Sequence, residues 1–225
     1  VTTGRTFYPD NEVYETMSFW FGTGRVFSFD GSKLTDWIYL NHSGQMRGQF
    51  GYGVTLFAED EHYKNILFED NYGLEISFQK TFSKKLSLNI KPKLGTEIIR
   101  VDAPYQARNT GIGIGIELKP SDEFKFNFSM DQSKSIKFEN SEVVYSDMIA
   151  RTRFEYQATS FLNIRLVAQY HRYYETFDIQ PLISYQPGPF SIFYLGTSRS
   201  YDTSYSGLVE SYGQIYLKVQ KLFSF

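Results

Sequence analysis

Apolar and polar residues alternate along most of this chain, and the alternation keeps its phase across predicted turns. Between residues 72 and 94, two alternating runs are separated by the polar segment Ser83–Lys85. A three-residue loop there would set Phe78 opposite Ile90, so that apolar side chains meet across the pair. A slip of one residue would turn every side chain to the opposite face. The matched faces therefore predict an antiparallel hairpin with one apolar and one polar face.

The same pattern recurs in three later segments, at 112–130, 148–170 and 177–194. Their predicted loops are Ser121–Glu123, Thr159–Phe161 and the two-residue turn Gly188–Pro189. This last turn pairs odd with even positions, and it predicts that Ile192 lies on the apolar face with Ile183. Strand signal is also present between residues 13 and 58, but the boundaries there are ambiguous.

The final stretch, Gly213–Phe225, alternates to its last residue, which is a phenylalanine. A soluble domain seldom ends in mid-strand on an aromatic residue, whereas an outer-membrane barrel closes with such a strand, and the assembly machinery reads its terminal aromatic. Phe223 and Phe225 are the predicted assembly signal. Lys221 falls on the apolar face, where it would have to extend toward the lipid headgroups.

Composition and strand length favour a membrane barrel. Aromatic residues make up 18% of the chain, with 21 Phe and 18 Tyr, as in the aromatic girdles of such barrels. The mean hydropathy of -0.36 argues against membrane-spanning helices. Predicted strands of roughly 10 to 14 residues match the ~9–11 that cross a bilayer and exceed the strands of most globular proteins. We therefore predict an all-β, antiparallel transmembrane outer-membrane β-barrel of about 12 strands.

Segments 102–110, 138–142, 171–175 and 200–211 are longer and polar, and they predict extracellular loops opposite short periplasmic turns. Residues 1–225 are expected to form a single barrel domain, either a compact protein or the C-terminal part of a longer one. The net charge of -2, from 23 basic and 25 acidic residues, gives no support for nucleic-acid binding. The absence of cysteine excludes disulfides and thiolate metal sites.

The polar face of the predicted strands carries charges that would face the barrel lumen. They are Glu75, Lys91, Lys93, Arg151, Arg153, Glu155, Arg165 and Lys218. These charges could form a constriction that filters solutes. Alternatively, they could pair across strands, Glu75 with Lys93 and Glu155 with Arg165, and fill the lumen.

Asn41-His42-Ser43 invites comparison with outer-membrane acyl hydrolases, which use a His and a Ser from the barrel wall. Adjacent residues of a strand point to opposite faces and cannot share a proton, and with Gly44 following, a turn is the preferred interpretation. His62 and His171 are expected in solvated loops, with no metal site. No catalytic residue and no cofactor is predicted.

The segment Arg151–Asp202 contains three motifs, RTRFEYQ, LNIRLVAQY and PLISYQPGPFSIFYLG. With these motifs it resembles the C-terminal barrel of a Bacteroidota outer-membrane family of unknown function, often found after a carbohydrate-binding family 9-like module. The resemblance covers about a quarter of the chain well, and the chain lacks the upstream module. It implies location and architecture, and it carries no catalytic residues.

Together these observations predict a non-enzymatic integral protein of the cell outer membrane. It would serve as a membrane anchor, as a component of a larger outer-membrane assembly, or as a narrow solute pore. Its expected partners are outer-membrane lipids, the barrel-assembly machinery during insertion, and other outer-membrane proteins. Two alternatives remain: an outer-membrane hydrolase using His42 or His62, and a soluble ligand-binding β-barrel.

Overall fold

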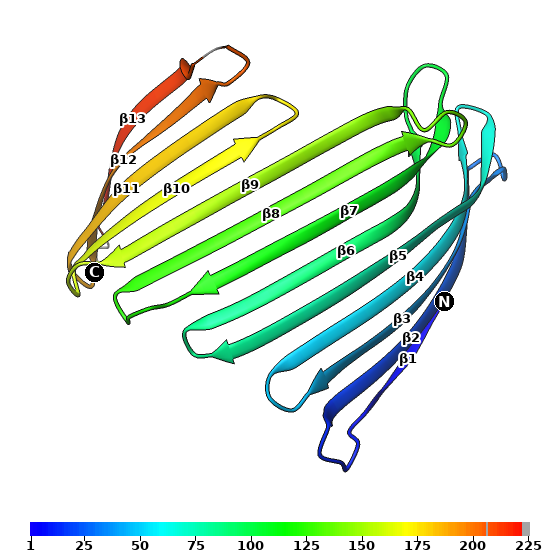
Figure 1. The fold of residues 1–225 in the computed structure, drawn as a ribbon, viewed down its shortest axis with the longest axis horizontal. Coiled ribbons are helices and arrows are strands. Elements are labelled where there is room, and N and C mark those ends of the chain that lie inside the picture. The colour runs from blue at the N-terminus through cyan, green and yellow to red at the C-terminus, as the bar shows by residue number, and fades with distance from the viewer. Residues whose placement is uncertain (206, 222–225) are drawn as a thin grey trace. The chain divides into compact units, whose positions relative to one another are not determined.

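The computed structural model describes residues 1–205 and 207–221, whose regular elements are all β-strands. Thirteen antiparallel strands form one sheet in chain order, each hydrogen-bonded to the next (Figure 1). They are β1 Thr2–Phe7, β2 Tyr14–Phe27, β3 Lys33–Met46, β4 Phe50–Tyr63, β5 Ile66–Ser83, β6 Leu86–Ile99, β7 Tyr105–Leu118, β8 Phe124–Lys137, β9 Val143–Gln157, β10 Leu162–His171, β11 Thr176–Gly188, β12 Ser191–Asp202 and β13 Val209–Lys221. In this part of the chain, no helix is long and apolar enough to span a membrane.

The described residues group into two compact units. Unit 1 comprises Val1–Phe82, Leu88–Gly113 and Gln132–Ser146, and unit 2 comprises Ser83–Ser87, Ile114–Asp131 and the chain from Asp147 on. Strands β1 to β4 belong wholly to unit 1, and β10 to β13 belong wholly to unit 2. The expectation of a single domain over residues 1–225 stays a prediction.

The all-β, antiparallel architecture is confirmed, and the described residues form 13 strands where about 12 were expected. The additional strand comes from the ambiguous first third of the chain. β1 is only six residues long, and its side chains are exposed. Its sequence, TTGRTF, has little apolar alternation, and it is a strand because its backbone pairs with β2 from Thr2↔Gly22 to Phe7↔Met17. Backbone pairing of this kind leaves no strong sequence signal.

Connections are short at both ends of the strands. They range from two residues, as at 64–65 and 189–190, to six residues at 8–13 and 203–208. The prediction of a long loop at 102–110 was wrong, because β7 begins at Tyr105. The polar residues there belong to the strand: Gln106 donates to Asn71, and Asn109 donates to Ser135.

The third predicted hairpin is confirmed, since Ile164 pairs with Tyr156 and continues the matched faces of β9 and β10. The face assigned in the fourth hairpin was wrong. Tyr185 pairs with Phe193, so Phe193 and Leu195 rather than Ile192 and Tyr194 lie on the apolar face. The register shifts between Tyr185 and Gly188. A bulge adds one residue to one strand and so reverses the parity that the turn alone would set.

The predicted turn at Asn41–Gly44 was also wrong. These residues lie in the middle of β3, where Asn41 pairs with Thr55 and Gly44 pairs with Tyr52 on β4. His62 lies in β4 and His171 ends β10, so neither occupies the loop that the sequence suggested. Local polarity misled the prediction at Asn41–Gly44 because β3 pairs with β2 and with β4 there, and pairing on both sides overrides the preference of the individual residues.

Candidate functional site

The apolar face of each unit is exposed over several neighbouring strands. In unit 1, the register places Phe21, Leu40, Leu56 and Leu74 side by side across β2 to β5. In unit 2, the corresponding row is Tyr156, Ile164, Ile183, Leu195 and Leu217 across β9 to β13. Leu56 is 49% exposed and Leu195 is 51% exposed. Contiguous apolar surface of this kind marks a face that contacts lipid or another protein.

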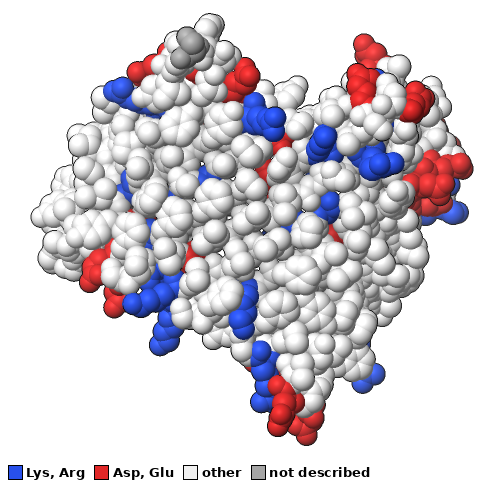
Figure 2. All heavy atoms as spheres, viewed as in Figure 1, with Lys and Arg blue, Asp and Glu red and all other residues white. Residues whose placement is uncertain are grey.

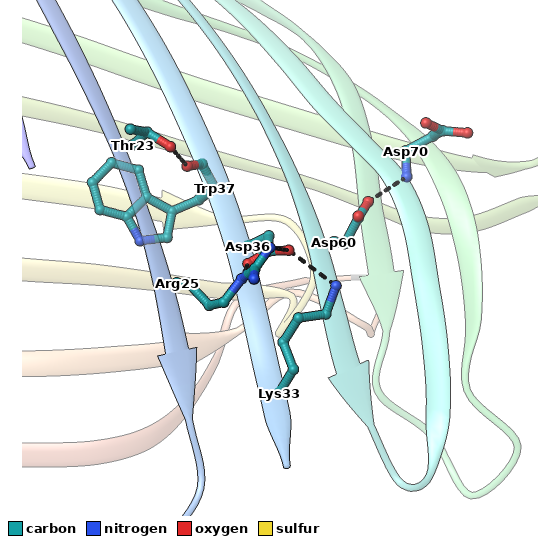
Figure 3. Close-up of polar contacts among 7 residues, drawn as sticks. All are labelled: Thr23, Arg25, Lys33, Asp36, Trp37, Asp60 and Asp70. Atoms are coloured by element: carbon teal, nitrogen blue, oxygen red, sulfur yellow. Dashed lines mark hydrogen bonds and ion pairs between the residues drawn. The ribbon is translucent and has the colours of Figure 1, made fainter. Parts of the chain in front are cut away.

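A row of charges ends the apolar face of unit 1 near the β2–β3 and β4–β5 turns (Figure 3). Arg25 donates two hydrogen bonds to Asp36, at 2.5 and 2.9 Å, and Lys33 lies 3.0 Å from the same carboxylate. Asp60, opposite Asp36 on β4, accepts from the backbone N–H of Asp70 at 3.2 Å. The ion pairs therefore mark where the apolar surface stops along these strands.

The other limit of the apolar face in unit 1 is Lys80, which pairs with Phe50 and donates to the carbonyl of Gly48. Phe50 and Asp60 are ten positions apart on β4. At ~3.3 Å per residue this is about 33 Å along the strand. A tilt of ~45° would reduce it to about 23 Å, close to the ~25 Å apolar band of membrane barrels.

Unit 2 repeats this arrangement. Its apolar face ends at the ion pair between Arg199 and Glu210, 3.3 Å apart, and at Lys221, which pairs with Ser191. The predicted position of Lys221 on the apolar face is thus confirmed. Figure 2 shows one face of the protein, on which most of the surface is uncharged and the largest groups of charged side chains lie near the edges.

A charged side chain on β1 interrupts the apolar face of unit 1. Arg5, on β1, pairs with Phe19 and lies over the ring of Phe7 at 5.0 Å. The remaining positions of this face on β1 are Thr3 and Phe7. The first strand, β1, therefore contributes less apolar surface to this face than the strands beside it.

The predicted lumen charges of unit 1 lie on its polar face. Glu75 pairs with Thr55, and Lys93 lies over Gly111, where an added Cβ would be 2.5 Å from the lysine Cε. Lys91 borders a hollow of about 440 Å³ lined by hydroxyl and amide side chains. These include Ser18, Ser43, Gln45, Ser77, Gln79 and Asn89. No ion pair joins Glu75 and Lys93 among the described residues.

The predicted lumen charges of unit 2 also share one face, but they pair differently from the expectation. Arg165 is the direct register partner of Glu155. Nevertheless, Glu155 is bonded by Arg153 on its own strand, whose Nε donates at 2.8 Å. Arg151 pairs with Gln169, and Lys218 pairs with Tyr194 and lies 5.9 Å from its ring. The predicted assembly signal, Phe223 and Phe225, lies outside the described residues.

Aromatic side chains cover glycines on the polar faces, an arrangement that the sequence analysis missed. The register sets each of five glycines opposite an aromatic residue, and a Cβ on these glycines would lie 2.1 to 2.6 Å from an atom of the opposite side chain. The pairs are Gly4 with Trp20, Gly22 with Tyr39, Gly24 with Trp37, Gly73 with Phe57 and Gly196 with Tyr216. Cross-strand stacking of this kind pins the register of a sheet. Only the register reveals it, because the partners are far apart in sequence.

The histidines do not assemble a hydrolase site in the described residues. His42 contacts the Tyr52 hydroxyl at 2.8 Å and the Ser18 carbonyl at 3.2 Å, and its ring stacks on Phe19. Ser43 lies on the opposite face, as predicted for adjacent strand residues. His62 has an Nδ1 atom that is buried without a hydrogen-bond partner. No group of three potential metal ligands is present in this part of the chain.

A third histidine, His171, forms a partly buried pair that the sequence did not indicate. Its Nε2 lies 2.8 Å from Asp147 Oδ2, and the side chains are 17% and 11% exposed. The second oxygen of Asp147 accepts from the backbone N–H groups of Met148 and Tyr173. Tyr174 packs edge-on against the histidine ring at 4.6 Å. Asp147 therefore holds the β10–β11 loop against β9.

Replacing Asp147 by alanine should loosen the β10–β11 loop. The change leaves the Tyr173 N–H and one His171 nitrogen without their acceptor, a cost of about 1–3 kcal/mol. Hydrogen exchange at the Tyr173 amide should accelerate, whereas exchange in β12 should not change. Equal protection of Tyr173 in the variant would show that other contacts fix this loop.

Two loops at the same ends of the strands are ordered by their own side chains. Glu142 accepts from Lys137 at 2.8 Å and from Asn140, and these bonds lower the pKa of its carboxyl group. Hydrogen bonds from the Ser32 amide and hydroxyl likewise lower the pKa of Asp30. A lowered pKa means that each carboxylate stabilises its loop above the unfolded-state pKa and loses that contribution as pH falls through the folded-state value.

Comparisons with known proteins find similarity only to solved structures. No family model matches the chain, and no curated protein matches it. Among solved structures, the chain is similar to the NanC porin, with 8% identity and a TM-score of 0.39 over 90% of this chain and 98% of that one. It is also similar to CymD, a monoaromatic hydrocarbon channel, with 9% identity and a TM-score of 0.38 over 100% of this chain and 86% of that one.

Proposed function

We propose that the chain is an integral outer-membrane β-barrel whose polar face lines a narrow passage for solutes. The observation that carries this proposal is the separation of the two faces. One face exposes large apolar side chains between limiting charges, and the other carries charges, amides and hydroxyls. In a membrane barrel the first face meets lipid and the second faces water.

The proposal includes closure of the sheet. An isolated sheet edge in a bilayer leaves backbone N–H and C=O groups without partners, at a cost of several kcal/mol per group. Closure would supply these partners, and the 13 strands of the described residues are compatible with it, since barrels with an odd number of strands exist.

A membrane anchor or a subunit of a larger assembly would show the same apolar face. The polar hollow beside Lys91 favours a passage, because a barrel that serves only as an anchor needs no solvated groove on its inner wall. The soluble alternative is disfavoured by Leu195 and Leu217, whose 51% and 71% exposure would leave apolar side chains in water.

The first test combines extraction with electrophysiology. We expect the protein to leave membranes only with detergent, to change its gel mobility on boiling, and to conduct ions in a planar bilayer. Extraction without detergent and unchanged mobility would contradict the membrane barrel. A detergent-dependent, heat-modifiable protein that does not conduct would contradict the passage and leave an anchor or a subunit.

A further inference from the structure

Three arginines cluster on the polar face of unit 2. Arg151 and Arg153 are two positions apart on β9, so their side chains leave the same face of the sheet. Arg165, on β10, is the register partner of Glu155, the next residue of that face on β9. Arg165 therefore lies diagonally across from Arg153, and Arg151 lies one further position of this face along β9, opposite Gln169.

One carboxylate, that of Glu155, lies within this cluster, and it already forms an ion pair. Glu155 is bound by Arg153 through Nε and Nη2. Among the described residues, no ion pair involves Arg151 or Arg165. The Nε of Arg165 is buried and has no hydrogen-bond partner. Two positive charges thus remain without a counter-charge in contact.

On the β10 to β12 side of the cluster, the neighbouring positions of this face carry few acidic side chains. Gln169 lies between Arg151 and Asp178, a carboxylate on β11. Beyond Arg165 the row continues through Leu182 to Gly196, which has no side chain. Apart from Glu155, which Arg153 already binds, no residue of this row supplies a negative charge to Arg165.

A protein gains nothing in stability by gathering like charges and leaving a buried guanidinium N–H unpaired. Such an arrangement is suited to a ligand that brings the missing acceptors. The guanidinium group binds the two oxygens of a carboxylate or phosphate in a bidentate manner. We propose that Arg151 and Arg165 form a binding site for oxyanions on the polar face. This inference rests on the proposed passage. An oxyanion site on the polar face would make that passage selective for anions.

The test is the ion selectivity of the protein in a planar bilayer with a potassium chloride gradient. We expect the reversal potential of the unmodified protein to show preferential passage of chloride, and inorganic phosphate to block part of the current. In the double variant Arg151→Gln, Arg165→Gln, the chloride-to-potassium permeability ratio should fall about threefold or more, and the phosphate block should be lost. Arg151→Lys, Arg165→Lys keeps the charge and should retain selectivity while phosphate binds more weakly.

Arg199→Gln is the matched control, because Arg199 belongs to the same unit but lies on the apolar face, paired with Glu210. It should leave the permeability ratio unchanged. Heat-modifiable mobility of each variant shows whether it folds. A conducting wild type that prefers potassium, or a folded double variant with an unchanged ratio, would overturn the anion site.

A wild type that does not conduct would contradict the proposed passage but would not decide the anion site. In that case, calorimetric titration of inorganic phosphate into the detergent-solubilised protein decides it. Binding that disappears in the double variant supports the site. Absence of binding to the wild type overturns it.

Discussion

Arginine at position 195 is expected to destabilise the folded protein in a bilayer by about 2–4 kcal/mol, the cost of a basic side chain facing lipid near the bilayer midplane. Leu195 lies in the middle of the exposed apolar row of unit 2, between Ile183 and Leu217. The measurement is a urea titration of folding into lipid vesicles, comparing Leu195→Arg with the unmodified chain.

Ser198→Arg is the control on the same strand. Ser198 pairs with Gln214 on the polar face, where an added guanidinium would remain in water. Its expected cost is about 1 kcal/mol or less, since lumen substitutions alter selectivity more than stability. If both variants lose the same free energy, or if neither loses any, the apolar face of unit 2 does not meet lipid.

Alanine at position 73 should be the next most damaging change. A Cβ on Gly73 would lie 2.1 Å from Cε1 of Phe57 and 2.2 Å from Cζ. The ring or the strand pairing must shift, at a cost of about 1–3 kcal/mol. The same vesicle folding assay measures it. Gly188→Ala is the control, because nothing lies within 4 Å of the added atom.

A second substitution separates ring overlap from backbone strain. Combining Gly73→Ala with Phe57→Leu removes the flat ring that the new methyl group would meet. The double variant should recover most of the loss caused by Gly73→Ala, so the two changes should be strongly non-additive. Additive losses would show that the glycine is required by the backbone and not by the ring.

The face on which each side chain lies was predictable wherever two strands pair without a bulge. The period of two assigned Leu166, Ile179 and Leu217 to an apolar face and Arg165 to a polar one, and the structure places them there. The prediction failed at Ile192 because the bulge between Tyr185 and Gly188 shifts the register by one residue. No local pattern in the sequence predicts where such an extra residue is inserted.

The candidate site was predictable in its residues but not in its contacts. The charges on the polar faces were identified by alternation alone. Their pairing was not, because Glu155 can reach either Arg165 across the strands or Arg153 along its own strand, and the structure selects Arg153. The pair between His171 and Asp147 was missed because 24 positions separate the two residues in sequence, and only the pairing of the strands brings them together.

Alternation by itself determined that this chain is all-β and antiparallel, with one apolar and one polar face, because a strand sends successive side chains to opposite sides. Tertiary structure alone decided the strand count, the extent of β3 through Asn41–Gly44, the stacking of Phe57 on Gly73 and the burial of Arg165 Nε without a hydrogen-bond partner. Each of these depends on which residue of a neighbouring strand lies opposite. That register is set by pairing across the sheet and by bulges, and a single strand does not encode it.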